Sequence, residues 1–362
     1  MRDFDKNRTV VLVQVENEMG LLGDCRDFSS QANEIYEGEI PGDMERFCGQ
    51  PGTWEDVFGE EAPEKFMVYA YAKAVERIAS TGKKEYPLPM YVNAWLEQYP
   101  WMPGTYPVGG PVAKCMELWK TFAPSIDLYA PDIYLPDFEA VCKEYAVNGN
   151  PLFVPEARPS MDSASNAFSA FGEFGALGFS PFAIESVAQG APQPLEPDLN
   201  QLNIMAEAFN HYRAGEYLSE AYGVLQNIQH HILECRMTPK MKGFTRNGRQ
   251  AGTLLKFEKY NFLVEYLPHG TESPKGGGIV IELSEDEFLI CGMNFQMKPM
   301  PKYHFSGAVE IESITEGRYE NRLWKPGRRL NGDEFRIQAG GHPALLRVRL
   351  NRYPCESGDA CV

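Results

Sequence analysis

The sequence predicts an α/β protein in which part of a parallel (β/α)8 barrel is followed by an antiparallel β-sandwich. Strand-like and helix-like segments alternate through the first 185 residues, at intervals of roughly 22–40 residues that are typical of parallel βαβ units. Polar residues stand at the carboxyl end of each predicted strand, as they do in barrel active sites. From about residue 245, apolar and polar residues alternate in segments separated by Gly, Pro and Asn turns, including Asn331-Gly332.

The predicted elements follow in order. The run TVVL at 9–12 leads into VQVENEMG at 13–20 and predicts a strand buried on both faces. A long insertion at roughly 20–62, rich in Gly, Pro and acids, is expected to form a lid or a wall of a site. The next four strands are expected at 88–95, 126–134, 151–156 and 176–184. Helices are expected near 63–80, 111–122, 137–146, 164–173 and 198–236.

The positions of the polar residues favour the barrel over a doubly wound sheet. They end all five predicted strands: Glu18, Asn93, Asp132 with Tyr134, Glu156, and Glu185. A doubly wound sheet gathers its ligand contacts at one switch point, and the sequence has no Gly-rich phosphate loop to mark one. The predicted domains are therefore a barrel part at 1–240 and a β-sandwich at 241–362, the latter acting in packing and stability.

Composition excludes several classes of function. The net charge of −16 argues against nucleic-acid binding and against docking on anionic membranes. No apolar run reaches the roughly 20 residues that span a bilayer. The polar start MRDFDKNRTV has no signal-peptide pattern, so the chain by itself is expected in the cytoplasm.

The cysteines and histidines predict neither a disulfide framework nor a metal site, and no cofactor is expected. The eight cysteines are scattered as expected of free thiols, and only Cys355 and Cys361 are a candidate pair. The six histidines lack metal-ligand spacing. His230 and His231 are adjacent on a predicted helix and are expected to point about 100° apart.

Two of the strand-terminal residues are suited to glycoside hydrolysis. Glu18 and Glu156 are three strands apart, which places them on opposite sides of a barrel mouth, facing one substrate. Two such carboxyl groups can act as acid/base and as nucleophile or water-activating base. The alternative is structural: strand-terminal glutamates also cap helices or pair with arginines such as Arg158.

The stretch VQVENEMG resembles the signature of glycoside hydrolase family 35, the β-galactosidases of clan A. The resemblance implies that Glu18 is the acid/base at the end of the fourth barrel strand and that Asn17 holds the 2-hydroxyl of the sugar. It also implies that Glu156, in LFVPEAR, is the nucleophile at the end of the seventh strand. The family's tyrosine after the catalytic glutamate is Met19 here.

Several further expectations rest on this resemblance. The chain would hold strands four to eight of the barrel, as an N-terminally truncated protein whose parent could be secreted or periplasmic. It would release terminal β-D-galactose from β-galactoside oligosaccharides or polysaccharides by double displacement. Tyr134 is expected to hydrogen-bond the nucleophile. Asn93, Trp95 and Glu185 are the expected sugar contacts, and Tyr99 and Trp101 are candidate stacking rings.

Three alternatives stay open at this point. The first is another clan A exo-glycosidase, a β-glucosidase or an arabinosidase. The second is an inactive truncated fragment that only binds carbohydrate. The third is a doubly wound enzyme of unrelated chemistry. The oligomeric state is also open.

Overall fold

The computed structural model describes residues 2–147, 149–188, 212–270, 273–303 and 307–354. The candidate pair Cys355 and Cys361 and much of the helical segment predicted at 198–236 lie outside these residues. The chain forms two compact units. The first unit holds Met1–Ile133 and Glu144–Pro155, and the second holds Tyr134–Lys143 and Glu156–Val362.

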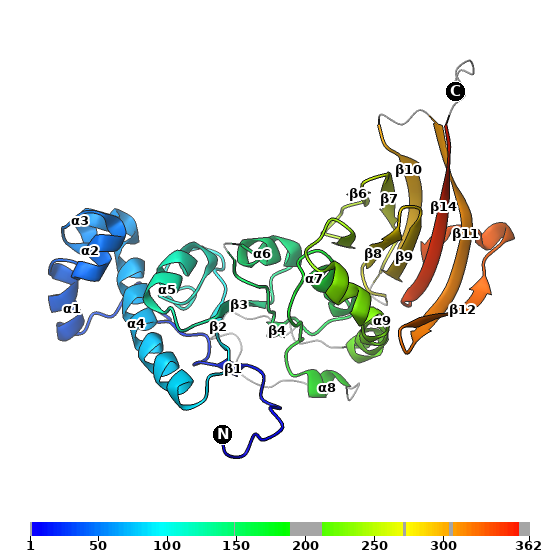
Figure 1. Cartoon of the computed structure of the whole chain (residues 1–362). Coiled ribbons are helices and arrows are strands. Elements are labelled where there is room, and N and C mark those ends of the chain that lie inside the picture. The colour runs from blue at the N-terminus through cyan, green and yellow to red at the C-terminus, as the bar shows by residue number, and fades with distance from the viewer. Residues whose placement is uncertain (1, 148, 189–211, 271–272, 304–306, 355–362) are drawn as a thin grey trace. The chain divides into compact units, whose positions relative to one another are not determined.

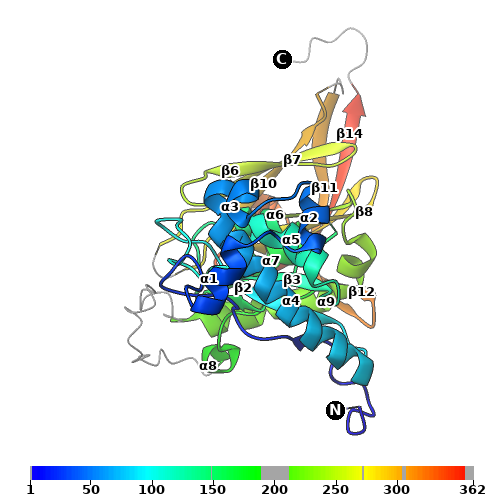
Figure 2. The same ribbon diagram turned by 90° about the vertical axis from the view of Figure 1, so that its left-hand side faces the viewer.

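A parallel sheet with flanking helices makes up the first unit (Figures 1 and 2). Strands β1 (Val13–Gln14), β2 (Met90–Trp95) and β3 (Leu128–Ile133) are neighbours in that order. The register places Gln14 beside Tyr91, and Trp95 beside Asp132. Because the three strands are parallel, the residues at their carboxyl ends lie side by side at the same end of the sheet.

The helices of the first unit follow from local sequence signals. Helix α4 (Ala62–Glu85) begins with a proline in its first turn and buries one apolar stripe, including Phe66, Val75 and Ala79. Helix α5 (Met116–Phe122) follows a short 3-10 turn.

The insertion at 20–62 forms three short helices rather than an open loop: α1 (Ser30–Glu37), α2 (Gly42–Cys48) and α3 (Trp54–Phe58). Thr53 and Asp56 form a capping box at the start of α3. Trp54 of α3 is fully buried, and its ring contacts the ring of Phe66 on α4.

Two strand predictions need correction. The first strand has only two residues, and Val11, expected inside a strand buried on both faces, is 74% exposed. In the described residues β1 has a single strand neighbour, β2. The fifth strand, expected at 176–184, does not form. Pro181 and the left-handed Ala183 (φ 49°) interrupt it, and helix α8 (Ile184–Ala188) begins there.

The second unit combines helices with two antiparallel sheets. Helix α6 (Phe138–Tyr145) begins in it, and β4 (Glu156–Ala157), α7 (Ser163–Gly172) and α9 (Ala214–Cys235) follow. The larger sheet has the order β12-β11-β14-β9-β8-β5, and the smaller has the order β13-β10-β7-β6. The strands of the larger sheet are β5 (Met241–Thr245), β8 (Gly277–Ser284), β9 (Glu287–Met293), β11 (Gly307–Glu320), β12 (Leu323–Arg329) and β14 (Ala344–Pro354). Those of the smaller sheet are β6 (Gly252–Lys256), β7 (Tyr260–Tyr266), β10 (Phe295–Pro301) and β13 (Ile337–Ala339).

An aromatic core fills the second unit, where alternating residues of the strands point inward. The ring of Phe288 contacts those of Phe257, Tyr260 and Phe262 edge-on. Helices α7 and α9 pack against the larger sheet (Figure 1). Gly243 of β5 permits the close approach of α7, because a Cβ there would lie 2.4 Å from the backbone nitrogen of Glu173.

The chain is thus a mixed α/β protein with a parallel sheet and, near its C-terminus, antiparallel sheets. The antiparallel strands were predicted from the alternating pattern, and the first of them begins at Met241. Among the described helices, none is both long and apolar enough to cross a membrane. The (β/α)8 arrangement stays a prediction.

Candidate active site

The chain bends sharply directly after β1, within the VQVENEMG motif. The backbone of Val15 still donates to the carbonyl of Tyr91 at 2.8 Å, as a strand residue would. Glu16 and Glu18 then have positive φ values of 60° and 43°, which non-glycine residues seldom adopt. Such backbone strain concentrates at functional sites, so the bend supports a functional role for Glu16 or Glu18.

Asn93 on β2 holds this bend in place. Its side chain is 1% exposed, and its Oδ1 accepts from the backbone N–H of Glu18 at 2.9 Å. Its Nδ2 donates to Asp132 Oδ2 at 2.7 Å and to Asn17 Oδ1 at 3.2 Å. One buried amide therefore fixes the backbone of Glu18 and the side chains of two neighbours.

Gln14, the last residue of β1, completes the network and was not predicted from the sequence. Its Nε2 lies 2.9 Å from Asn17 Oδ1 and 3.1 Å from Asn93 Oδ1. Tyr91 on β2 donates its hydroxyl to Gln14 Oε1 at 2.7 Å. The only sequence signal for this role is that Gln14 is a polar residue inside an apolar strand.

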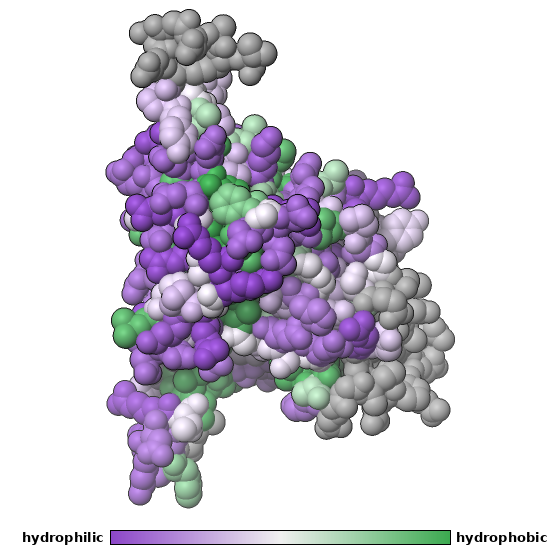
Figure 3. Space-filling model, turned by 90° about the vertical axis from the view of Figure 1, so that its right-hand side faces the viewer, coloured by the Kyte–Doolittle hydropathy of each residue, from purple (hydrophilic) through white to green (hydrophobic). Residues whose placement is uncertain are grey.

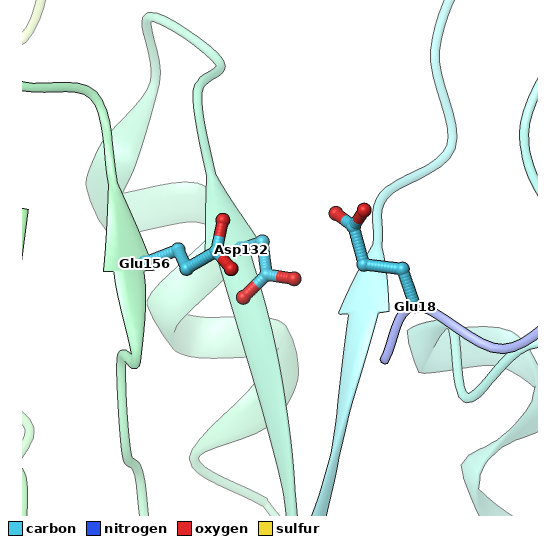
Figure 4. Close-up of side chains that lie close together, drawn as sticks. All are labelled: Glu18, Asp132 and Glu156. Carbon is cyan, nitrogen blue, oxygen red and sulfur yellow. The ribbon is translucent and has the colours of Figure 1, made fainter. Parts of the chain in front are cut away.

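Asp132 on β3 brings a second carboxylate to Glu18. The side chain of Asp132 is buried, Glu18 is half-buried, and a carboxylate oxygen of each lies within 4.8 Å of the other. Figure 4 draws both, with Glu18 after β1 and Asp132 on β3. Oxygen ligands at this spacing also suit a hard cation, but acidic groups are often this close without one, and we assign no metal.

Glu156, the other expected catalytic carboxylate, belongs to the second unit and has a hydrogen-bond partner there. It lies on β4, and Figure 4 draws its side chain as well. Tyr134 donates its hydroxyl to Glu156 Oε2 at 3.0 Å, the hydrogen bond expected from the sequence. Burial raises the pKa of the Glu156 carboxyl, and the Tyr134 hydroxyl opposes that rise.

The remaining predicted contacts lie in different surroundings. Trp95 is half-buried at the end of β2. Glu185 is not at a strand end: it is exposed in the first turn of α8, because the fifth strand does not form. Tyr99 and Trp101 are 75% and 59% exposed in the loop after β2, and their rings contact each other.

The segment that follows Glu18 is packed tightly against the loop after β2. Leu21 and Val108 form a two-way backbone bridge, and Gly23 donates to the carbonyl of Gly104. A Cβ on Gly20 (φ 154°) would lie 2.5 Å from Pro107. Only glycine fits where the chain passes Pro107. The path of the chain after the motif is therefore fixed by contact with the aromatic-rich loop.

A partly buried ion network anchors the same loop. The Lys114 ammonium lies 2.8 Å from Glu64 Oε2 and 2.7 Å from Glu97 Oε1, and it donates to the Tyr106 hydroxyl at 2.7 Å. Burial acts to lower the pKa of Lys114, but these hydrogen bonds outweigh it and the pKa is raised. The lysine is therefore a cation that ties helix α4 to the loop.

The structure thus brings together Asn17, Glu18 and Asn93 in the first unit, and Tyr134 with Glu156 in the second. It adds Gln14 and Asp132 to the first group.

The neighbouring histidines of α9 differ from expectation. The ring centroids of His230 and His231 are 4.1 Å apart, because side-chain rotation overcomes the 100° offset of their positions on the helix.

One family model matches part of the chain. Residues 218–339 match the model of a family described as a domain of unknown function (DUF5597). None of the curated proteins matches the chain. Among solved structures, an Anoxybacillus alpha-amylase, described as giving insight into a new glycosyl hydrolase subclass, is similar at 9% identity with a TM-score of 0.34. That match covers 79% of this chain and 57% of the amylase, so the chain spans less than two thirds of that protein.

A second similar structure is a protein described as an NADPH-dependent oxidoreductase from Desulfitobacterium hafniense DCB-2. It is 11% identical, with a TM-score of 0.18, and the match covers 74% of this chain and 81% of that one. Likenesses at these TM-scores do not define the fold or the chemistry of the chain.

Proposed function

We propose that the chain carries the acid/base and the nucleophile of a retaining glycoside hydrolase that releases terminal β-D-galactose from β-galactosides. The observation that carries the proposal is the Asn17-Glu18 pair of the VQVENEMG motif, which resembles the β-galactosidase signature. A buried amide holds the backbone of Glu18 and the side chain of Asn17. Rigid support of this kind is what a proton donor at a fixed glycosidic oxygen requires.

In the first step Glu18 donates its proton to the glycosidic oxygen while Glu156 attacks the anomeric carbon. The bond to the aglycone breaks, the aglycone leaves with the proton, and a galactosyl ester forms on Glu156.

In the second step Glu18, now ionised, takes a proton from water as the water attacks the same carbon. The ester to Glu156 breaks and galactose leaves with its original configuration. Asn17 is proposed to hold the 2-hydroxyl in both steps, and Tyr134 to stabilise the charge of the free Glu156 carboxylate. That the two glutamates act on one substrate is inferred from the motif and the order of the strands.

A non-catalytic chain that only binds carbohydrate is the second candidate. One observation favours it: burial raises the pKa of Glu156, and a protonated carboxyl cannot attack carbon. The Tyr134 hydrogen bond opposes this effect, which is why we rank catalysis first.

The test uses nitrophenyl β-galactoside, with the β-glucoside and the α-L-arabinoside as rival substrates. Glu18→Ala and Glu156→Ala should each lower kcat by about a thousandfold or more. Added azide should restore turnover in both, giving the β-galactosyl azide with Glu18→Ala and the α-galactosyl azide with Glu156→Ala. The opposite anomers arise because azide attacks the ester in the first variant and the substrate itself in the second.

The control is Glu117→Ala, which removes an exposed carboxylate on α5 and should leave turnover unchanged. A folded chain that binds β-galactosides and hydrolyses none of the three substrates would favour the binding candidate. Preferred hydrolysis of the β-glucoside or of the arabinoside would replace galactose as the substrate. Release of the inverted sugar would overturn the double displacement.

A further inference from the structure

The second unit contains a polar cavity remote in sequence from the VQVENEMG motif. It has a volume of about 480 Å³ and lies between helix α9 and the hairpin that joins β11 to β12. Gln226, Gln229 and His230 line it from the helix. Tyr319, Asn321 and Arg322 line it from the hairpin. We call it the α9–hairpin cavity; its lining residues fall inside the segment that matches the domain of unknown function.

Hydrogen bonds between helix α9 and the β11–β12 hairpin hold the two walls of the cavity in place. Asn227 of α9 donates to the carbonyl of Tyr319 at 2.9 Å and accepts from its backbone N–H at 2.7 Å. This two-bond clamp fixes the hairpin to the helix. Asn321 and Arg322 both have positive φ, 51° and 63°, as a two-residue hairpin turn requires. Their side chains are therefore presented from a defined turn.

The charge at the cavity is opposite in sign to that of the chain. The sequence has 50 acidic residues and a net charge of −16, yet no acidic side chain is among the lining residues. Arg322 forms no ion pair with any residue that the structure describes. Arg322 is the one Lys, Arg, Asp or Glu among the described residues that line the cavity, and a guanidinium is suited to bind an anionic ligand.

The other lining groups are hydrogen-bonding groups and rings. The rings of His230 and His231 both contact Tyr319, at centroid distances of 4.8 and 4.9 Å. The Nε2 atoms of both histidines are buried and have no hydrogen-bond partner among the described residues. Burial lowers the pKa of His231, which favours its neutral imidazole. Carboxamides and rings around one arginine are groups that bind the hydroxyls, the carbon face and the acid group of a sugar.

We propose that the α9–hairpin cavity binds an acidic sugar residue, with its carboxylate or sulfate group on Arg322 and its hydroxyls on Gln226, Gln229 and Asn321. The volume fits one or two sugar rings within the range of small-molecule sites. The choice of a sugar rests on the proposed function, whereas the choice of an anion rests on the cavity alone.

The surface around the hairpin also suits a polar ligand. Figure 3 shows the face of the second unit that carries β11 and β12 as mainly hydrophilic, with hydrophobic side chains in small separate patches. An extended apolar patch would instead indicate a protein partner.

The test is titration calorimetry on the full chain carrying Glu18→Gln, so that no ligand is hydrolysed. The probes are a galacturonic acid dimer, galactose 6-sulfate, neutral galactobiose and inorganic sulfate. We expect the first two to bind at the cavity, and Arg322→Gln to weaken that binding by about tenfold or more. Arg329→Gln is the matched control: it removes an exposed charge of the same sign from β12, outside the lining residues, and should leave binding unchanged.

The outcomes separate the two parts of the proposal. Preference for the galacturonate dimer over galactose 6-sulfate, or the reverse, identifies the acid group within the proposed class. Equal binding of inorganic sulfate would overturn the sugar, and equal binding of galactobiose would overturn the anion. No binding, or equal loss in both arginine variants, would overturn the site. Because binding is measured without turnover, each of these results is independent of whether the chain hydrolyses β-galactosides.

Discussion

At the scale of single residues, the placement of Glu18 depends on a side chain from the neighbouring strand. The Asn93 amide uses both of its ends inside the protein: its oxygen accepts from Glu18 and Gln14, and its nitrogen donates to Asp132 and Asn17. A buried amide with all of these bonds is costly to disturb. Asn93, expected from the sequence to contact sugar, therefore also has a positioning role for the acid.

Tyr134 gives the proposed nucleophile a testable pH dependence. Glu156 must be ionised to attack, so activity is lost as the pH falls through its pKa, which burial raises. Tyr134→Phe removes the hydrogen bond at 3.0 Å that favours the ionised form. The pKa should then rise further, which moves the acidic limb of kcat/KM to higher pH and lowers the rate at neutral pH by about tenfold or more.

The matched control is Tyr86→Phe, which removes a comparable hydrogen bond from a tyrosine hydroxyl to Asp5, at 2.9 Å. It should leave the pH profile unchanged. An acidic limb that stays in place in Tyr134→Phe would show that this hydroxyl does not act on the ionisation of Glu156.

At the residue scale, the sequence predicted candidate site residues where the residue type itself, such as a glutamate at a strand end, indicates the chemistry. Glu18, Glu156 and the bond from Tyr134 were expected from strand ends and the motif, and the bond is present. The role of Gln14 was missed because it follows from a bend with positive φ at Glu16 and Glu18. Strand alternation predicts no such bend, so it also predicts none of the contacts that depend on it.

At the scale of elements, the connection between α9 and the β11–β12 hairpin rests on few strong contacts. Asn227→Ala removes both hydrogen bonds to the Tyr319 backbone and leaves its partly buried N–H and carbonyl unpaired. We expect the free energy of unfolding to fall by about 1–3 kcal/mol, measured by urea denaturation. Asn227→Asp keeps the acceptor but loses the donor, and should show a smaller loss. Equal stability of Asn227→Ala and the unmodified chain would contradict the clamp.

Helices and strands were predictable where the hydrophobic periodicity and the residues that begin or end an element indicate the same structure. The strand expected at 126–134 is β3 (Leu128–Ile133), and the helix expected at 164–173 is α7 (Ser163–Gly172). The strand expected at 176–184 does not form although the segment is apolar, because Pro181 and the left-handed Ala183 interrupt it. Short apolar runs do not distinguish strands from packed loops, and a proline inside one lowers the odds of a strand.

At the scale of the whole molecule, the first strand is the part that differs most from a closed parallel fold. Parallel sheets are normally covered on both faces, and a closed barrel leaves no edge strand. Here β1 has two residues, one strand neighbour in the described chain, and an exposed Val11 just before it. Composition and hydrophobic patterning predicted the two kinds of sheet. They carry no information on which compact unit each segment joins, since that depends on contacts between distant residues.

An exposed edge of this kind predicts self-association that depends on salt. The backbone groups on the open side of β1 and the 74% exposed Val11 can pair with another copy of the chain. The net charge of −16 opposes this pairing at low ionic strength, and salt screens that repulsion. Light scattering after size-exclusion chromatography should therefore show a larger mass at high salt than at low salt. Val11→Lys places a charge on the edge and should keep the chain monomeric at both salt concentrations. Ala308→Lys, at an exposed position on strand β11 of the second unit, should not. A mass that is independent of salt, or equal suppression by both variants, would show that β1 is not the surface through which copies associate.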